Sequence, residues 1–377
     1  MNTGKVAYTP ASAFEATQRV LGWDLLRGLC AIAVSSYHLL YWQDVMQLHV
    51  FGSYGVYLFF TLSGASLAYT YSGRMAAGDF SFGKFLWVRY LRLAPLYLAL
   101  MVVVLPWKLG KDGATAGLLA MYATNASFLF GFFDPLTHSV LVGGWSLGIE
   151  AIFYLLFPLL MVSFKSRWLP WVTFFLLLAL QTVWIYATVG TDAAAPRWQA
   201  YHQLPAFAAY FMGGCMIGVA HRRKLFADFR PGMRGVLMIA CGFALTLAVN
   251  PEKGGQELVG WRGVLLTGWC FLLVHAASRL QLKRNFSSVA RHLGDATYGL
   301  YLLHPVIFFG LTFIILPRLG LASPEHWSLA ARLGLAAAVL LAAFALGLAS
   351  ERYFEQPLRG WSKRRLKRMR PAGPSAK

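Results

Sequence analysis

The sequence has little charge, and acidic residues are especially scarce. Charged residues make up 13% of the 377 positions and hydrophobic residues 58%, whereas a soluble domain normally carries about twice that share of charge. Only 15 residues are Asp or Glu against 34 Lys or Arg, which gives a net charge of +19. This composition excludes an ordinary soluble domain and predicts an all-α integral membrane protein. The positive charge then indicates orientation and contact with membrane lipids, not nucleic-acid binding.

Cysteine chemistry and a second domain are also missing. The four cysteines lie in apolar stretches without C-x-x-C or metal-like spacing, so we expect small buried side chains and no metal site. Residues 1–22 lack an apolar core before a cleavage site, so we expect a cytoplasmic segment and not a cleaved signal peptide. Without a repeat or a long linker, residues 23–357 are predicted to form one membrane domain, followed by a basic cytoplasmic tail over 358–377.

Long apolar runs are abundant, and ten are long enough to form transmembrane helices. They are about 24–42, 54–72, 87–107, 145–164, 168–189, 202–220, 233–249, 261–280, 296–316 and 328–350. An eleventh run, 114–133, is weaker because it contains Asn125 and ends at Asp134. If this run does not cross, most basic residues and both termini lie in the cytoplasm, as the positive-inside rule requires. We therefore predict about ten spans, with 114–133 re-entrant or interfacial on the outer side.

Arg27 and His38 are two ionisable residues within the first apolar run. Eleven residues of helix rise roughly 16 Å, about half of the bilayer core, and return to nearly the same helix face. Ionisable groups at that depth are costly and usually functional. The spacing therefore favours His38 as a general base near the middle of the membrane. The alternatives are a histidine that packs between helices and an Asp24–Arg27 ion pair at the inner end.

Glu150 is the only acidic residue well inside a predicted span, roughly 8 Å below its outer end. A carboxylate at that depth needs a partner, and we expect a histidine or an arginine that faces the same cavity. The alternative is a purely structural role.

Arg89 and Arg92 lie at the inner end of the third span, three residues apart and hence on one helix face. A pair of guanidinium groups matches the oxygens of a phosphate, which favours a nucleotide-like ligand from the cytoplasm. The alternative is that both side chains reach out to lipid phosphates.

Three further residues are candidates for substrate binding. Ser63 lies in a glycine-containing stretch, Gly52–Gly64, that allows either a close helix contact or a bound ligand. Tyr301 and His304 are one helical turn apart in the ninth span, and His304 precedes Pro305, where the helical hydrogen-bond ladder is broken. His304 is therefore expected either to line a cavity or to cap the freed carbonyl groups.

Taken together, these residues resemble the membrane-bound acyltransferase-3 family. The pieces follow the family order: Arg27 with His38 as R-x10-H, Leu58–Gly64 (LFFTLSG), Arg89–Arg92 as R-x-x-R, Trp145–Pro158 (WSLGIEAIFYLLFP) and Tyr298–His304 (YGLYLLH). The resemblance covers residues 24 to about 357. Many family members carry an appended esterase-like domain, whereas this sequence is expected to be a stand-alone transferase.

The resemblance implies an enzyme of a bacterial inner membrane that transfers an acyl group, usually acetyl, from cytoplasmic acyl-CoA. The acceptor would be a hydroxyl of an extracytoplasmic glycan or lipid-linked saccharide. It implies that Arg89 and Arg92 meet the phosphates of CoA, while His38, Glu150 and Arg27 serve catalysis. His38 would act as a base or carry the acyl group itself. The alternatives are a transporter or flippase of lipid-linked sugars and a non-catalytic membrane partner, and the oligomeric state is left open.

Overall fold

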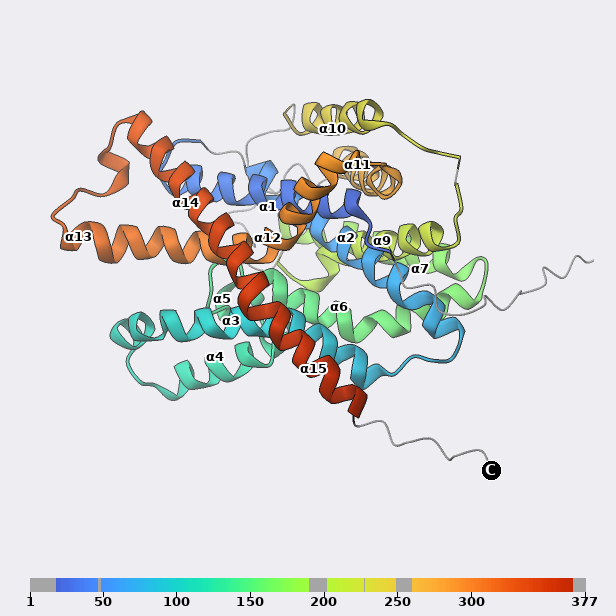
Figure 1. Cartoon of the computed structure of the whole chain (residues 1–377), viewed down its shortest axis with the longest axis horizontal. Helices are drawn as coiled ribbons and strands as arrows, with labels where there is room; N and C mark the ends of the chain where they lie inside the picture. The colour runs from blue at the N-terminus through green and yellow to red at the C-terminus, as the bar shows by residue number, and fades with distance from the viewer. Residues whose placement is uncertain (1–17, 47–48, 190–201, 227, 249–259, 369–377) are drawn as a thin grey trace, which may run out of the picture.

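The computed structural model describes residues 18–46, 49–189, 202–226, 228–248 and 260–368, and within these ranges it contains helices and no strands (Figure 1). Most of segment 1–22 and the end of the tail 358–377 lie outside the described residues. The α-helices are α1 (Leu21–Tyr41), α2 (His49–Ala76), α3 (Phe82–Asp112), α4 (Ala116–Ala126), α5 (Pro135–His138), α6 (Trp145–Val162), α7 (Leu169–Val189), α9 (Ala208–Arg222), α10 (Met233–Ala248), α11 (Gly260–Arg279), α12 (Arg284–Gly310), α13 (Leu316–Arg318), α14 (Leu329–Ser350) and α15 (Gln356–Arg368).

Six helical segments in the described ranges are long and apolar enough to cross a membrane. They contain α3, α6, α7, α9, α12 and α14. The other four predicted spans coincide with α1, α2, α10 and α11, which do not meet the same criterion of length and hydropathy. The all-helical membrane architecture is thus confirmed, whereas the count of ten spans is not. Polar residues within α1 and α2, such as Asp24, Ser35 and Thr61, lower the hydropathy of these helices although they are buried in the bundle.

The centre of the bundle is formed by α1, α2, α9 and α12. Helix α2 packs along α9, and α1 packs between α2 and α12, which in turn packs on α14. The contact between α2 and α9 is close because Gly64, Gly214 and Gly218 lie directly against the facing backbone. Gly64 is therefore a packing residue, whereas its neighbour Ser63 faces a cavity. Three cysteines are buried as expected, but Cys241 is exposed on α10 at the edge of the bundle.

The weak apolar run, 114–133, forms α4 and a short 3-10 turn next to α3 (Figure 1). The 11 residues of α4 rise roughly 16 Å, so this helix alone is too short to cross a bilayer core. Asn125 is fully buried and fixes the segment, because its Oδ1 accepts hydrogen bonds from the Tyr97 hydroxyl (2.6 Å) and the Val140 amide (3.0 Å). Which side of the membrane α4 occupies stays a prediction.

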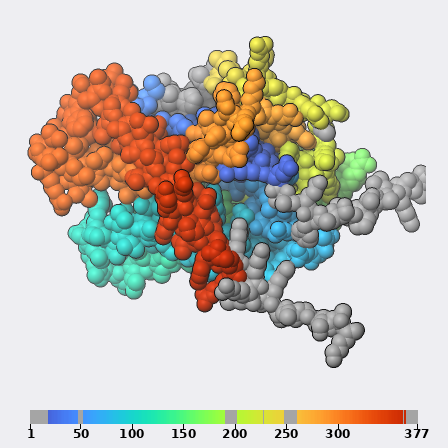
Figure 2. Space-filling model, viewed as in Figure 1, coloured from blue at the N-terminus to red at the C-terminus, as the bar shows by residue number. Residues whose placement is uncertain are grey.

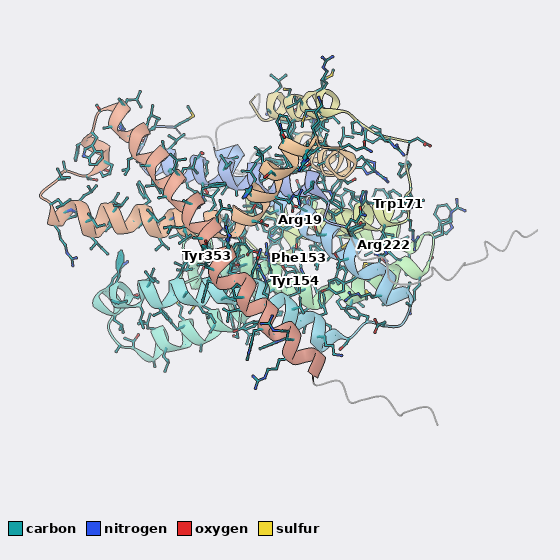
Figure 3. The ribbon with its side chains drawn as sticks, in the orientation of Figure 1. Arg19, Phe153, Tyr154, Trp171, Arg222 and Tyr353 are labelled. Carbon is teal, nitrogen blue, oxygen red and sulfur yellow. The ribbon has the colours of Figure 1, made fainter. Side chains whose placement is uncertain are left out.

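The C-terminal arm runs across the near face of the bundle. Helix α14 continues through a π-helical turn, Glu351–Glu355, into α15, and both lie over helices from the N-terminal half (Figure 2). Helix α15 is joined to α3 by a hydrogen bond from the Trp87 indole to Ser362 Oγ (2.8 Å). The labelled side chain of Tyr353 marks the junction of α14 and α15, and Tyr154 marks the middle of the bundle behind it (Figure 3).

Candidate active site

A cavity of about 320 Å³ lies between α1, α2, α3, α6 and α12. Six of the eight residues predicted to form the site line it: Arg27, Ser63, Arg89, Arg92, Glu150 and Tyr301. These residues come from five helices that are far apart in the sequence, so the fold gathers them in one place. The remaining two, His38 and His304, do not line this cavity but form a pair next to it.

Glu150 has hydroxyl partners and not the expected histidine or arginine. Its Oε1 accepts hydrogen bonds from Ser63 Oγ (2.7 Å) and from the Tyr154 hydroxyl (2.7 Å). Arg27 and Arg89 act on Glu150 electrostatically from across the cavity, without an ion-pair contact among the described residues. The carboxylate is therefore held by two neutral donors, with positive charge nearby.

Arg27 connects the inner end of α1 to α2. One Nη2 hydrogen bond goes to the Leu62 carbonyl (3.2 Å) and another to Ser66 Oγ. The expected Asp24–Arg27 pair is also present, at 3.4 Å. Because these contacts hold the guanidinium group across two helices, Arg27 presents a fixed positive charge to the cavity.

Arg89 and Arg92 differ in what surrounds their charge. The guanidinium group of Arg89 lies over the rings of Tyr71 (5.4 Å) and Phe85 (5.9 Å) and donates a hydrogen bond to the Tyr71 hydroxyl (3.2 Å). Its Nε is buried and has no hydrogen-bond partner, and Arg89 forms no ion pair within the described ranges. Arg92, in contrast, is 3.7 Å from the Glu351 carboxylate of the C-terminal arm. Arg89 thus carries a buried charge that contacts aromatic rings and a hydroxyl but no carboxylate within the described ranges.

A second cavity, of about 470 Å³, shares Arg27 and Arg92 with the first. We call it the vestibule; it is bounded by Arg19, Asp24, Asp295, Glu351 and Arg359, among others. Ion pairs organise its walls: Arg19 contacts Asp24 and Asp295 (2.8 Å), and Arg359 contacts Glu351 and Glu355 (3.5 Å). The vestibule is therefore a polar chamber at the ends of α1 and α3 that are predicted to face the cytoplasm.

His38 and His304 are hydrogen-bonded to each other. The distance between His38 Nδ1 and His304 Nε2 is 3.1 Å, and Trp42 stacks on both rings, with centroids 5.0 Å and 5.8 Å away. His304 is 1% exposed, pairs with His38 and lies 3.0 Å from the Leu300 carbonyl through Nδ1, and a role in substrate binding stays a prediction. Glu150 is not among the described contacts of His38, so the neighbour that orients this ring is another imidazole.

Tyr301 links the cavity to the histidine pair. Its ring lines the cavity and lies 6.3 Å from the ring of His304. Its hydroxyl donates to the Gly143 carbonyl (2.8 Å) and lies 2.9 Å from Ser146 Oγ. The hydroxyl group is thus bound to the loop before α6, and the ring forms the wall between the two parts of the site.

Several site residues were not singled out from the sequence. Tyr154 is one helical turn after Glu150, and Trp42 is one turn after His38, so helical spacing alone could have indicated both. The role of Glu351 could not be found in this way, because its partner Arg92 is far away in the sequence.

Comparisons with known proteins identify the family of this chain. The family model described as an acyltransferase domain, Acyl_transf_3, matches residues 20–352. A curated relative, the peptidoglycan O-acetyltransferase OatA of Listeria monocytogenes, is 28% identical over 368 residues, which cover 89% of this chain and 55% of the relative. The chain thus spans about half the length of that relative. No solved structure matches the chain.

Proposed function

This chain belongs to the acyltransferase-3 family, and on that premise we propose that it is an acyl-CoA-dependent O-acetyltransferase of a bacterial inner membrane. The acceptor is a hydroxyl of an extracytoplasmic or lipid-linked glycan. One observation carries this proposal: buried guanidinium groups line a cavity, and a ring of the same cavity, Tyr301, contacts an imidazole pair just outside it. Acyl-CoA has phosphates at one end and a thioester at the other. The arginines would meet the phosphates, and the imidazole pair would meet the thioester.

The donor enters from the vestibule in this proposal. Arg89 and Arg92 bind the phosphates of CoA, and Arg27 adds positive charge where the vestibule meets the inner cavity. The unpaired charge of Arg89 supports this assignment, since a buried guanidinium group is stabilised when an anion replaces lost water. The pantetheine arm then extends along the cavity towards Tyr301 and brings the thioester near the histidine pair.

His38 is the general base in the proposed reaction. It removes the proton from the acceptor hydroxyl as the oxygen attacks the thioester carbon. The new ester C–O bond forms, the C–S bond breaks, and the CoA thiolate takes up the proton from His38. Glu150 stabilises positive charge in the cavity through its carboxylate, and exclusion of water limits hydrolysis of the thioester.

A glycan acceptor is supported by the Listeria relative, which is named as a peptidoglycan O-acetyltransferase. Both termini are cytoplasmic in this proposal, which places the vestibule on the cytoplasmic side. The donor therefore enters from the cytoplasm, and the acceptor approaches from the opposite side. Ten spans would satisfy this orientation, because an even number of crossings returns the chain to its starting side.

Mass spectrometry of surface glycans tests the function. Cells that produce the wild-type protein are compared with cells that produce His38→Ala or no protein. We expect an added mass of about 42 Da per acetylated residue with the wild type only. Glycans that change in abundance at the surface but not in mass would instead indicate a transporter or flippase.

A further inference from the structure

The relation between His38 and His304 determines which nitrogen of His38 can act as a base. The two rings are nearly coplanar, with an interplanar angle of 10°, and their centroids are 5.4 Å apart. Since the facing nitrogens are only 3.1 Å apart, the rings meet at their edges, as an N–H···N hydrogen bond requires. One of these two nitrogens must carry the hydrogen and the other must accept it.

The surroundings of His304 decide the direction of this hydrogen bond. His304 Nδ1 is 3.0 Å from the Leu300 carbonyl oxygen and 3.1 Å from Ser35 Oγ. Pro305 has no N–H to donate to the Tyr301 carbonyl, so the helix supplies no donor to that oxygen at this turn. A carbonyl oxygen can only accept, so Nδ1 of His304 must carry a hydrogen.

The rest of the arrangement follows from that assignment. A neutral imidazole carries one hydrogen, so His304 Nε2 has a free lone pair and accepts from His38 Nδ1. His38 then carries its hydrogen on Nδ1, and its Nε2 has a free lone pair. Among the residues that the structure describes, none is hydrogen-bonded to this Nε2. The opposite direction would place the hydrogen on Nε2 and leave His38 with no lone pair free to accept a proton.

We propose that His304 is a positioning residue that fixes the tautomer of His38, so that Nε2 is the proton-accepting atom. This inference rests on the proposed function for its catalytic meaning, although the tautomer itself is a property of the free protein. Proton transfer from the acceptor makes His38 a cation, and its Nδ1–H···N hydrogen bond to His304 becomes charge-assisted and stronger. Trp42, stacked on both rings, keeps them in one plane.

Two substitutions separate this role from simple packing. His304→Gln retains an amide oxygen that accepts from His38 Nδ1 and an amide N–H that donates to the Leu300 carbonyl. His304→Leu fills similar space but does neither. We expect His304→Leu to lower the rate of acetyl transfer on the order of 10²–10⁴-fold, the range for a lost or mis-set base. His304→Gln should recover most of that loss.

His275→Leu is the matched control, because His275 lies on α11 and stacks on Phe229 away from the cavity. It should leave the rate unchanged. Equal loss in the Leu and Gln variants of His304, with the control active, would contradict the proposal, because packing alone would then explain the effect.

Nitrogen-15 NMR of histidine-labelled protein in lipid bilayers provides the direct test. The His38 signals are assigned by their loss in His38→Gln, at a pH where the ring is neutral. We expect a protonated Nδ1 and an unprotonated Nε2 in the wild type, and a mixture of both tautomers in His304→Leu. A wild-type His38 protonated on Nε2 would overturn the inference. If NMR shows the predicted tautomer but the protein transfers no acetyl group, the proposed function is rejected and the tautomer assignment stands.

Discussion

At the scale of single residues, the site depends on how each buried charge is compensated. Glu150 is held by the hydroxyls of Ser63 and Tyr154, Arg92 by Glu351, and Arg89 by an aromatic and hydroxyl environment. A charge that lacks an opposite charge in contact is costly to bury. Arg89 is therefore the residue of the site that gains most from binding an anion.

Arg89→Gln is predicted to weaken the binding of acetyl-CoA. Loss of a charge-assisted hydrogen bond costs about 1.5–3 kcal/mol, which corresponds to roughly a 10- to 150-fold rise in Kd. Titration of the purified protein with acetyl-CoA measures this Kd. Arg74→Gln is a suitable control, since Arg74 lies over the same Tyr71 ring (5.8 Å) but is exposed and outside the cavity. An unchanged Kd in Arg89→Gln would contradict the assignment of Arg89 to the phosphates of CoA.

Glu150→Gln and Glu150→Ala should separate charge from shape. The Gln variant keeps an oxygen for Ser63 and Tyr154, so we expect normal thermal stability but loss of most activity. The Ala variant leaves both hydroxyls without an acceptor and should also lose about 1–3 kcal/mol of stability. Turnover and detergent-solubilised thermal unfolding are measured on the same preparations. A fully active Glu150→Gln would reduce Glu150 to a hydrogen-bonding role.

Six of the eight residues named from the sequence line one cavity, and the Asp24–Arg27 pair was expected, but the partners of Glu150 and His38 were not. Residue type and depth indicate that Glu150 and His304 need partners, because these properties depend only on local sequence. The partners themselves depend on helix rotation and register between segments more than 80 residues apart, such as Ser63 and Glu150. Sequence periodicity contains no information on that register.

At the scale of helices, the C-terminal arm completes the vestibule. Glu351 contacts both Arg92 of α3 and Arg359 of α15, and the side chain of Arg359 is only 16% exposed. The same carboxylate thus joins the arm to the bundle and compensates one of the proposed phosphate-binding arginines. Donor binding must compete with this ion pair.

Glu351→Gln is therefore predicted to have two opposite effects. Removal of the competing carboxylate should tighten acetyl-CoA binding by about 2- to 10-fold, while loss of the Arg359 contact should lower stability by about 1–3 kcal/mol. Isothermal titration and thermal unfolding measure the two effects. Glu325→Gln serves as the control, because Glu325 is an exposed residue whose ion-pair partner is the exposed His326. Weaker CoA binding in Glu351→Gln would show that Glu351 does not compete with the donor.

The segment around α4 carries the topology prediction. If it stays on the outer side, cysteines introduced at Ala114 and Thr137 should both react with an impermeant thiol reagent added from outside. Thr137 lies in α5, where Asp134 Oδ1 accepts hydrogen bonds from the backbone amides of Leu136 and Thr137. Labelling at Thr137 from the cytoplasm alone would mean that 114–133 crosses and that the span count is odd.

The long helices were readily predicted from the sequence, because each apolar run coincides with a helix. Apolar length determines whether a segment can cross, and this signal is local. The count of crossings is harder, since α1 and α2 bury polar side chains in the bundle and so lose the hydropathy that marks a span. Two helices that carry site residues, α1 and α2, are thus missed by hydropathy, whereas α3, α6 and α12 are identified by it.

At the scale of the whole molecule, transfer between the two faces of the membrane requires a path through the bundle. The vestibule, the cavity and the histidine pair follow one another along α1 and α12, from Arg27 to His38. Those two residues are separated by roughly 16 Å of helix, about half of a bilayer core. A CoA thioester supplied from one side would therefore meet its acceptor near the middle of the membrane.

Transfer across a sealed proteoliposome tests this central claim most directly. Radiolabelled acetyl-CoA is supplied only to the face that carries the C-terminal tail, and a glycan acceptor is enclosed on the other face. We expect labelled acceptor with the wild-type protein and none above background with His38→Ala. Label that appears only when donor and acceptor share one face, or that persists in His38→Ala, would contradict this claim.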